Sequence, residues 1–102
     1  MSVYLQTKSW EEAREAIKKS KGVAIVPIGS VEQHSYHLPL GTDTYVAMTV
    51  AEGAAEKTGA VLTPPVWFGW SPHHMVLPGT ITIRPEVLSE MTYDIIESLV
   101  AH

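Results

Sequence analysis

The sequence places two isolated carboxylates in its central loops, Glu32 and Asp43, with no Lys or Arg between them. His34 follows Glu32 by two positions, so in an extended segment both side chains point to the same side. Two unpaired carboxylates folded against strand ends would be costly. A divalent metal ion would remove that cost, and oxygen ligands combined with an imidazole nitrogen suit zinc, manganese or iron better than calcium or magnesium.

A simpler interpretation of these residues stays open, because spacing alone does not separate the two. Glu32 and Asp43 could be solvated loop residues, and Asp43 stands where the N-cap of a following helix is expected. Further polar loop residues are candidates for contacting a substrate or for supporting the metal ligands, and the first of them could also be a ligand itself. They are His37, Ser71, His73 and His74.

Three helices and three strands are predicted around these loops. The helices cover residues 10–20, 43 or 44 to 58, and 85–99; the strands cover residues 23–28, 60–63 and 80–83. Ser9 and Glu12 have capping-box spacing, Gly22 and Gly59 suit helix C-termini, and Pro85 suits a first helical turn. Helix and strand segments thus alternate along the chain, with long loops after the first two strands.

This alternation predicts the α/β fold class, with a parallel sheet covered by helices. The run at residues 23–28 is apolar on both faces, as expected of a central strand. In open α/β sheets, ligands bind beyond the carboxyl ends of the strands, which is where both long loops begin. The length of 102 residues fits one small domain, residues 1–102.

Composition excludes several functions. The chain has 7 Lys and Arg against 11 Asp and Glu, a net charge of −4, and no Cys. Without a basic cluster, we expect no nucleic-acid partner. The lack of Cys excludes disulfides and thiolate metal ligands. We see neither a secretory signal nor an apolar spanning segment, and therefore expect a cytoplasmic protein without a membrane partner.

Two segments carry a resemblance to a known family. Residues 26–43, VPIGSVEQHSYHLPLGTD, resemble the signature P-x-G-S-x-E-Q-H-G-P-H-L-P-L-x-T-D of the creatininase (creatinine amidohydrolase) family. Residues 71–82, SPHHMVLPGTIT, are similar to that family's S-P-x-H-M-x-F-P-G-T-I-T segment. The resemblance extends over residues 22–100, so it includes both long loops.

The resemblance implies a three-layer α/β/α sandwich with a mostly parallel sheet, incomplete at its C-terminal side. It also implies two divalent metal ions, zinc and/or manganese, bridged by a water or hydroxide. Glu32 would bind one metal, His34 the other, and Asp43 both. The implied activity is that of a metal-dependent amidohydrolase, in which the metal-bridging hydroxide hydrolyses a non-peptide C–N bond in a small cyclic amide or formamide.

Two departures from the family pattern affect these expectations. Ser35 and Tyr36 stand where the family usually has Gly-Pro, which is expected to place a hydroxyl and a ring near the site and to alter substrate choice. Family members are also longer, and a later Asn-Gly-His type loop supplies a further His and Glu. We therefore expect residues 1–102 to be the amino-terminal half of a catalytic unit, with an incomplete metal site, and whether this half is active alone stays open.

Alternative functions from other classes stay open. The chain could be a non-catalytic remnant or an oligomer-forming module, whose exposed apolar surface is buried against a copy or a missing C-terminal half. It could also be a single-metal binding domain that uses Glu32, His34 and Asp43, with water in the open positions. For the enzyme, the expected partners are a small-molecule substrate and further copies in a homo-oligomer.

Overall fold

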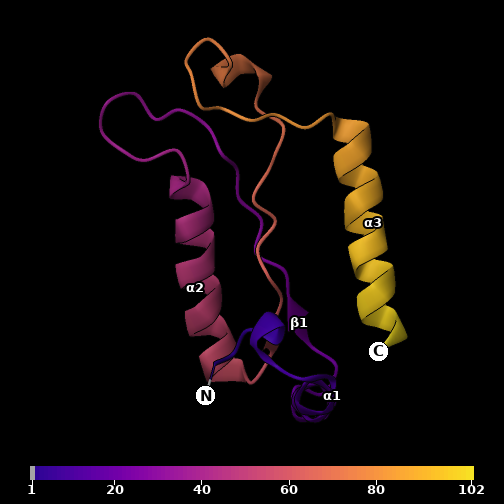
Figure 1. The fold of residues 1–102 in the computed structure, drawn as a ribbon. Coiled ribbons are helices and arrows are strands. Elements are labelled where there is room, and N and C mark those ends of the chain that lie inside the picture. Colours follow the sequence, from indigo (N-terminus) through magenta and orange to yellow (C-terminus); the bar gives the residue numbers. More distant parts are fainter. Residues whose placement is uncertain (1) are drawn as a thin grey trace.

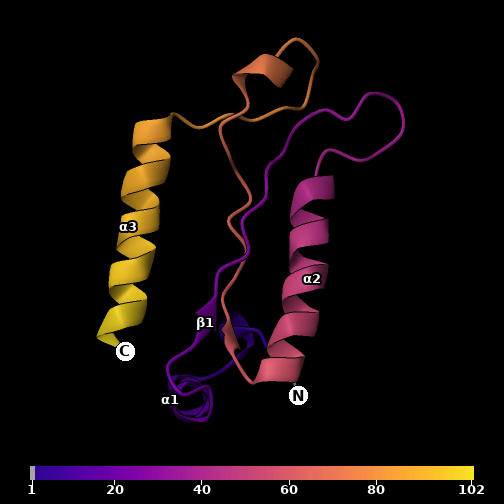
Figure 2. The same ribbon diagram turned by 180° about the vertical axis from the view of Figure 1, so that it is seen from behind.

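The computed structural model describes residues 2–102 and arranges them in three layers (Figure 1). Strands β1 (Ala24–Ile25) and β2 (Val61–Leu62) run in parallel between helices α2 (Thr42–Thr58) and α3 (Pro85–Ala101). The view from behind shows the same order of helix, strands and helix (Figure 2). The predicted α/β fold with a parallel sheet is therefore confirmed. The remaining elements are helix α1 (Trp10–Lys19) and the short 3-10 helices η1 (Leu5–Thr7) and η2 (Pro72–His74).

Helix α1 begins as predicted and ends differently. Glu12 N–H donates to Ser9 Oγ at 3.2 Å, and Ser9 N–H donates to Glu12 Oε1 at 2.9 Å, which completes the capping box. The C-cap is Ser20, so the prediction that Gly22 caps the helix is wrong. Instead, Lys21 and Gly22 adopt φ angles of 57° and 80°, and these two left-handed residues turn the chain toward β1.

Helix α2 corrects the alternative assignment of Asp43. Its N-cap is Gly41, and Asp43 lies inside the first turn, so Asp43 is not the N-cap. A carboxylate in that turn still interacts favourably with the helix dipole. The predicted end is confirmed, since Gly59 follows Thr58 as a C-cap with φ of 77°.

The regular strands are shorter than predicted, because prolines interrupt their hydrogen-bonding ladder. Pro27 cannot donate a hydrogen bond, although its carbonyl accepts one from Val66 N–H at 2.9 Å. The prediction of a regular strand at residues 80–83 is wrong. There Ile81 bridges to Val31 in an antiparallel sense, and Thr82 bridges to Gly69 in a parallel sense, so neither pairing extends into a strand.

The buried core lies between α2 and the strands. Its central members are Ala51 and Ala55 of α2 and the fully buried Leu62 of β2. Small alanine side chains let the helix backbone approach the strand closely. Helix α2 and the strand pair therefore form the tightly packed side of the molecule.

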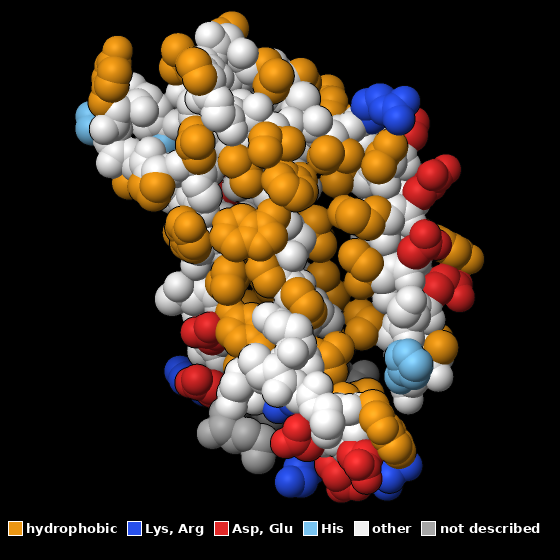
Figure 3. Space-filling model, in the orientation of Figure 1, with side chains coloured by type: hydrophobic (Ala, Val, Ile, Leu, Met, Phe, Trp, Pro, Cys, Tyr) orange, Lys and Arg blue, Asp and Glu red, His pale blue; other side chains and the backbone are white. Residues whose placement is uncertain are grey.

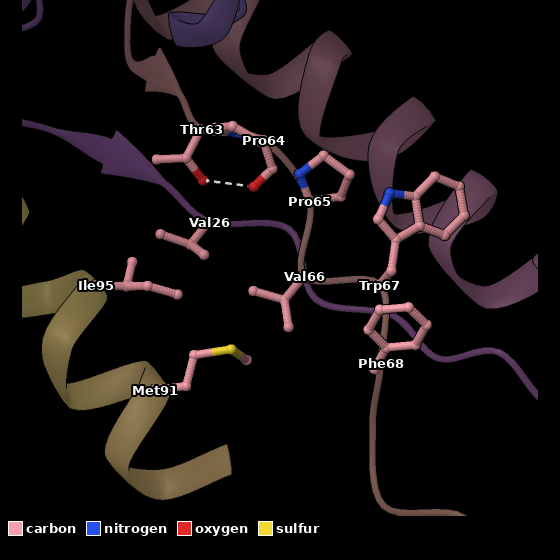
Figure 4. A pocket seen from close by; sticks show the side chains of 9 residues that line it. All are labelled: Val26, Thr63, Pro64, Pro65, Val66, Trp67, Phe68, Met91 and Ile95. Atoms are coloured by element: carbon pink, nitrogen blue, oxygen red, sulfur yellow. Dashed lines mark hydrogen bonds between the residues drawn. The ribbon is translucent and has the colours of Figure 1, made fainter. Parts of the chain in front are cut away.

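The opposite side is loosely packed. A cavity of about 360 Å³ separates the strand layer from α3, and Figure 3 shows the surface hollowed there between apolar side chains. Met91 and Ile95 of α3 point across it toward Val66 and Val26 (Figure 4). No residue of α3 is fully buried. Within residues 2–102, neither this helix nor any other is long and apolar enough to cross a membrane.

Gly29 permits the close approach that brings the first long loop against α2. A Cβ at this position would lie 2.1 Å from Thr44 Oγ1 and 2.4 Å from Thr44 Cα. Thr44 is completely buried in the first turn of α2. Because the obstacle includes backbone, a side chain at Gly29 would have to displace the start of the helix.

We therefore expect Gly29→Ala to lower the free energy of unfolding by about 1–3 kcal/mol, the usual cost of overpacking. Gly53→Ala is the control. Gly53 lies on α2, the helix that contains Thr44, and a Cβ at Gly53 would meet nothing within 4 Å. The free energy of unfolding of Gly53→Ala should rise by about 0.5–1 kcal/mol, because alanine has a higher helix propensity than glycine. Urea unfolding measures both, and equal changes in the two variants would contradict the close approach.

Candidate metal centre

Three predicted ligand residues lie together at one end of the strand layer. Glu32, His34 and Asp43 each offer a ligand atom, and these atoms lie within 4.8 Å of one another. Glu32 and His34 come from the loop after β1, and Asp43 comes from the first turn of α2. The loop folds back on itself, with Glu32 N–H donating to the carbonyl of Leu40 at 3.1 Å. The structure brings the three side chains together, and their role as metal ligands stays a prediction.

His34 provides the test of whether a metal ion fits. Its Nε2 is buried and makes no hydrogen bond with any of residues 2–102, although Asp43 Oδ2 lies 3.4 Å away. A buried polar atom without a partner carries a desolvation cost. A metal ion bound by this nitrogen would remove the cost. One imidazole and two carboxylates form a donor set suited to zinc or manganese, so the residues fit such an ion.

Asp43 is held in its charged form. Ser30 Oγ–H donates to Asp43 Oδ2 at 2.9 Å, and this bond is the main reason that the pKa of Asp43 is lowered. Burial opposes the shift, while the neighbouring Glu32 and His34 add to the lowering. Since metal ligands must be deprotonated, the lowered pKa favours binding of a cation.

Glu32 is contacted by the second long loop. Ser71 Oγ–H donates to Glu32 Oε2 at 2.5 Å, and His74 Nε2 lies 3.9 Å from the same oxygen. A further hydrogen bond joins Gln33 Nε2 to His74 Nδ1 at 2.9 Å. The candidates Ser71 and His74 therefore lie at the ligand cluster.

The other two candidates lie outside this contact. The ring of His73 packs against His74, with 4.2 Å between centroids, and its side chain is exposed. His37 is exposed, and in the part of the chain that the structure describes no hydrogen bond or ion pair joins it to the cluster. Any role of His37 or His73 in binding a substrate stays a prediction.

The Ser35–Tyr36 segment does not bring a ring onto the ligands. Tyr36 is fully exposed, so it contacts none of the three candidate ligand side chains. Ser35 adopts a left-handed backbone with φ of 58°, a conformation that glycine adopts without steric cost. Its N–H donates to Gln33 Oε1 at 2.9 Å, which helps to hold the turn.

Sequence reasoning missed two residues that support the cluster, Ser30 and Gln33. Both belong to residues 26–43, the first segment that carries the family resemblance, and they flank Val31 and Glu32. They are uncharged, so the search for isolated carboxylates and histidines passed over them. Their place inside the matched segment was the signal that could have identified them.

Comparison with known proteins identifies the family. The family model described as creatinine amidohydrolase matches residues 6–102, and the chain therefore belongs to the creatininase family. It corresponds to the amino-terminal portion of that family's proteins. The family membership that residues 26–43 and 71–82 indicated is thus confirmed.

Curated relatives differ in their named activities. The 3-dehydro-scyllo-inosose hydrolase of Thermotoga maritima is 36% identical over 95 residues, covering 92% of this chain and 30% of that protein. The mycofactocin precursor peptide peptidase of Mycolicibacterium smegmatis is 46% identical over 72 residues, covering 65% and 29%. The creatinine amidohydrolase of Pseudomonas putida is 26% identical over 106 residues, covering 99% and 41%. The chain thus spans less than half the length of each relative.

Solved creatininase structures share the fold. A manganese form superposes with a TM-score of 0.92 at 27% identity, covering 100% of this chain and 42% of that one. A Zn-Zn form of a mutant creatininase gives 0.91 at the same identity and coverage. These matches confirm the incomplete α/β/α sandwich and show which metals the solved relatives contain.

We expect Ser30→Ala to raise the pKa of Asp43, because the variant removes the strongest hydrogen bond to the charged form. The stability that Asp43 contributes is present above its unfolded-state pKa and is lost as the pH falls through the folded pKa. Ser30→Ala should therefore narrow the pH range, between the folded and the unfolded pKa of Asp43, over which this stability is lost. NMR titration of the Asp43 carboxyl carbon in metal-free protein measures the shift. Ser98→Ala on α3 is the control, and an unchanged Asp43 pKa in Ser30→Ala would contradict the assignment.

Proposed function

We propose that this chain supplies part of the metal centre of a creatininase-family amidohydrolase that hydrolyses a non-peptide C–N bond in a small cyclic amide or formamide. The observation that carries the proposal is the cluster of Glu32, His34 and Asp43, in which the buried His34 Nε2 makes no hydrogen bond among the described residues. When bound, divalent zinc or manganese ions supply Lewis-acid catalysis, which polarises an amide carbonyl.

The three side chains have separate tasks in this proposal. Glu32 would hold one metal ion, His34 would hold the other, and Asp43 would contact both, since a carboxylate offers two oxygens. Ser30 keeps Asp43 deprotonated through the bond to Oδ2. The zinc and manganese forms of solved creatininases support this choice of metals.

The rest of the catalytic unit lies outside this chain in the proposal. The chain spans 29–41% of the curated relatives, so further ligands come from additional polypeptide or from another copy in a homo-oligomer. The substrate is a small molecule, which accords with a solved creatininase complexed with creatine.

A peptidase is the second candidate. Identity to the mycofactocin precursor peptide peptidase is 46%, against 26% to the creatinine amidohydrolase, although it covers fewer residues. The names of both relatives describe cleavage of an amide-type bond. The difference lies in whether the substrate is a peptide or a small cyclic amide.

Metal binding is tested by elemental analysis after incubation with zinc or manganese. We expect wild-type protein to retain metal and Asp43→Ala to lose most of it, since that variant removes the only proposed ligand shared by both ions. Asp94→Ala, an exposed carboxylate on α3, is the matched control and should retain wild-type metal content. Unchanged metal content in Asp43→Ala would refute the proposed centre.

Hydrolysis is tested on the metal-loaded protein with creatinine, other cyclic amides, formamides and a short peptide. If another copy of the chain supplies the further ligands, we expect release of product from a cyclic amide or formamide above metal-only controls, and loss of this activity in Asp43→Ala. Cleavage of the peptide alone would favour the peptidase. Metal binding without any hydrolysis would favour the alternative of a metal-binding module that needs a second half to act.

A further inference from the structure

Ser71 connects the second long loop to the candidate ligands. Its side chain is 1% exposed, and its hydroxyl donates to Glu32 Oε2 at 2.5 Å across 39 positions of sequence. Hydrogen bonds to a charged carboxylate are stronger than those between neutral groups. The contact is therefore a buried, charge-assisted bond directly on a proposed ligand.

The backbone around Ser71 is anchored on both sides. Ser71 N–H donates to Thr82 Oγ1 at 2.7 Å, and the Ser71 carbonyl accepts from His74 N–H at 3.1 Å. The first bond ties Ser71 to the segment that leads into α3, and the second closes η2. The hydroxyl thus extends from a fixed point, which limits the positions that Glu32 can take.

The same loop also holds the residue beside Glu32. Gln33 N–H donates to Thr80 Oγ1 at 3.0 Å, and Thr80 Oγ1–H donates to the carbonyl of His74 at 3.0 Å. Together with the bond between Gln33 and His74, these contacts fix the backbone next to Glu32. Backbone and side chain of this ligand are therefore both set by the second loop.

We propose that Ser71 is a positioning residue for the metal centre, acting through Glu32. Its hydroxyl holds Oε2, and the carboxylate that it holds lies with His34 and Asp43 in the ligand cluster. Asp43 is arranged in parallel, with Oδ2 bonded to Ser30. This inference rests on the proposed function, since it assigns Ser71 a role only if Glu32 binds metal.

The test measures zinc affinity by calorimetry and the visible spectrum of the cobalt-substituted protein. We expect Ser71→Ala to weaken zinc binding by about 10–100-fold, the usual effect of removing a partner that orients a metal ligand. Ser71→Thr keeps the hydroxyl and should restore both the affinity and the cobalt spectrum. Ser98→Ala removes an exposed serine hydroxyl on α3 and should leave both readouts unchanged.

Far-UV circular dichroism establishes that each variant is folded. If Ser71→Ala does not fold, Thr82→Val replaces it, because this change removes the acceptor for Ser71 N–H and should also weaken zinc binding. Wild-type affinity in the folded Ser71→Ala protein, or in Thr82→Val used in its place, would overturn the inference. A folded Ser71→Thr that binds as weakly as Ser71→Ala would also overturn it. Wild-type protein that binds neither zinc nor cobalt would instead overturn the proposed metal centre and this inference together.

Discussion

The structure depends on placing two carboxylates beside an imidazole without a basic side chain to balance them. Among the described residues, no Lys or Arg forms an ion pair with Glu32 or Asp43; His74 Nε2 lies 3.9 Å from Glu32, and His34 Nε2 lies 3.4 Å from Asp43. Hydroxyl groups from Ser30 and Ser71 provide hydrogen bonds but no positive charge. The protein therefore positions negative charge in a partly buried place, which accords with a site that binds cations.

The fold meets this constraint by bringing three separate segments to one end of the strand layer. The loop after β1 carries Glu32 and His34, α2 carries Asp43 in its first turn, and the second loop carries Ser71. Gly29 is central to this arrangement because its missing side chain lets the first loop lie against the backbone of Thr44. The candidate ligand cluster and the tightly packed side of the molecule thus share the same close contact.

Several features set by local interactions could be predicted from the sequence, although the cap expected at Gly22 could not, and the extent of the strands was not predicted correctly. The capping box at Ser9, the end of α2 at Gly59 and the start of α3 at Pro85 depend on neighbouring residues. The extent of the strands was overpredicted, because proline interrupts the ladder at Pro27 and residues 80–83 bridge to different partners. The sequence also singled out Glu32, His34 and Asp43, which the structure brings together, while their role as metal ligands stays a prediction.

The supporting residues were harder to foresee. The bond from Ser71 to Glu32 crosses 39 positions, and neutral hydroxyls leave no charge or periodic pattern in a sequence. The resemblance to the creatininase family identified the segments that contain these residues. It did not distinguish the serine that contacts a ligand from the exposed histidine, His37, a few positions from His34.

The cavity beside α3 divides the molecule into parts of unequal stability. Helix α3 has no buried residue and contributes nothing to the core cluster of Ala51, Ala55 and Leu62. Opening of such a weakly packed element costs less free energy than global unfolding, so its amide protons exchange faster than those of α2. A cation bound at Asp43 stabilises α2 through mass action. If Asp43 binds metal, loading should therefore slow exchange at the start of α2 and leave α3 almost unchanged, which would make the two helices distinguishable in solution.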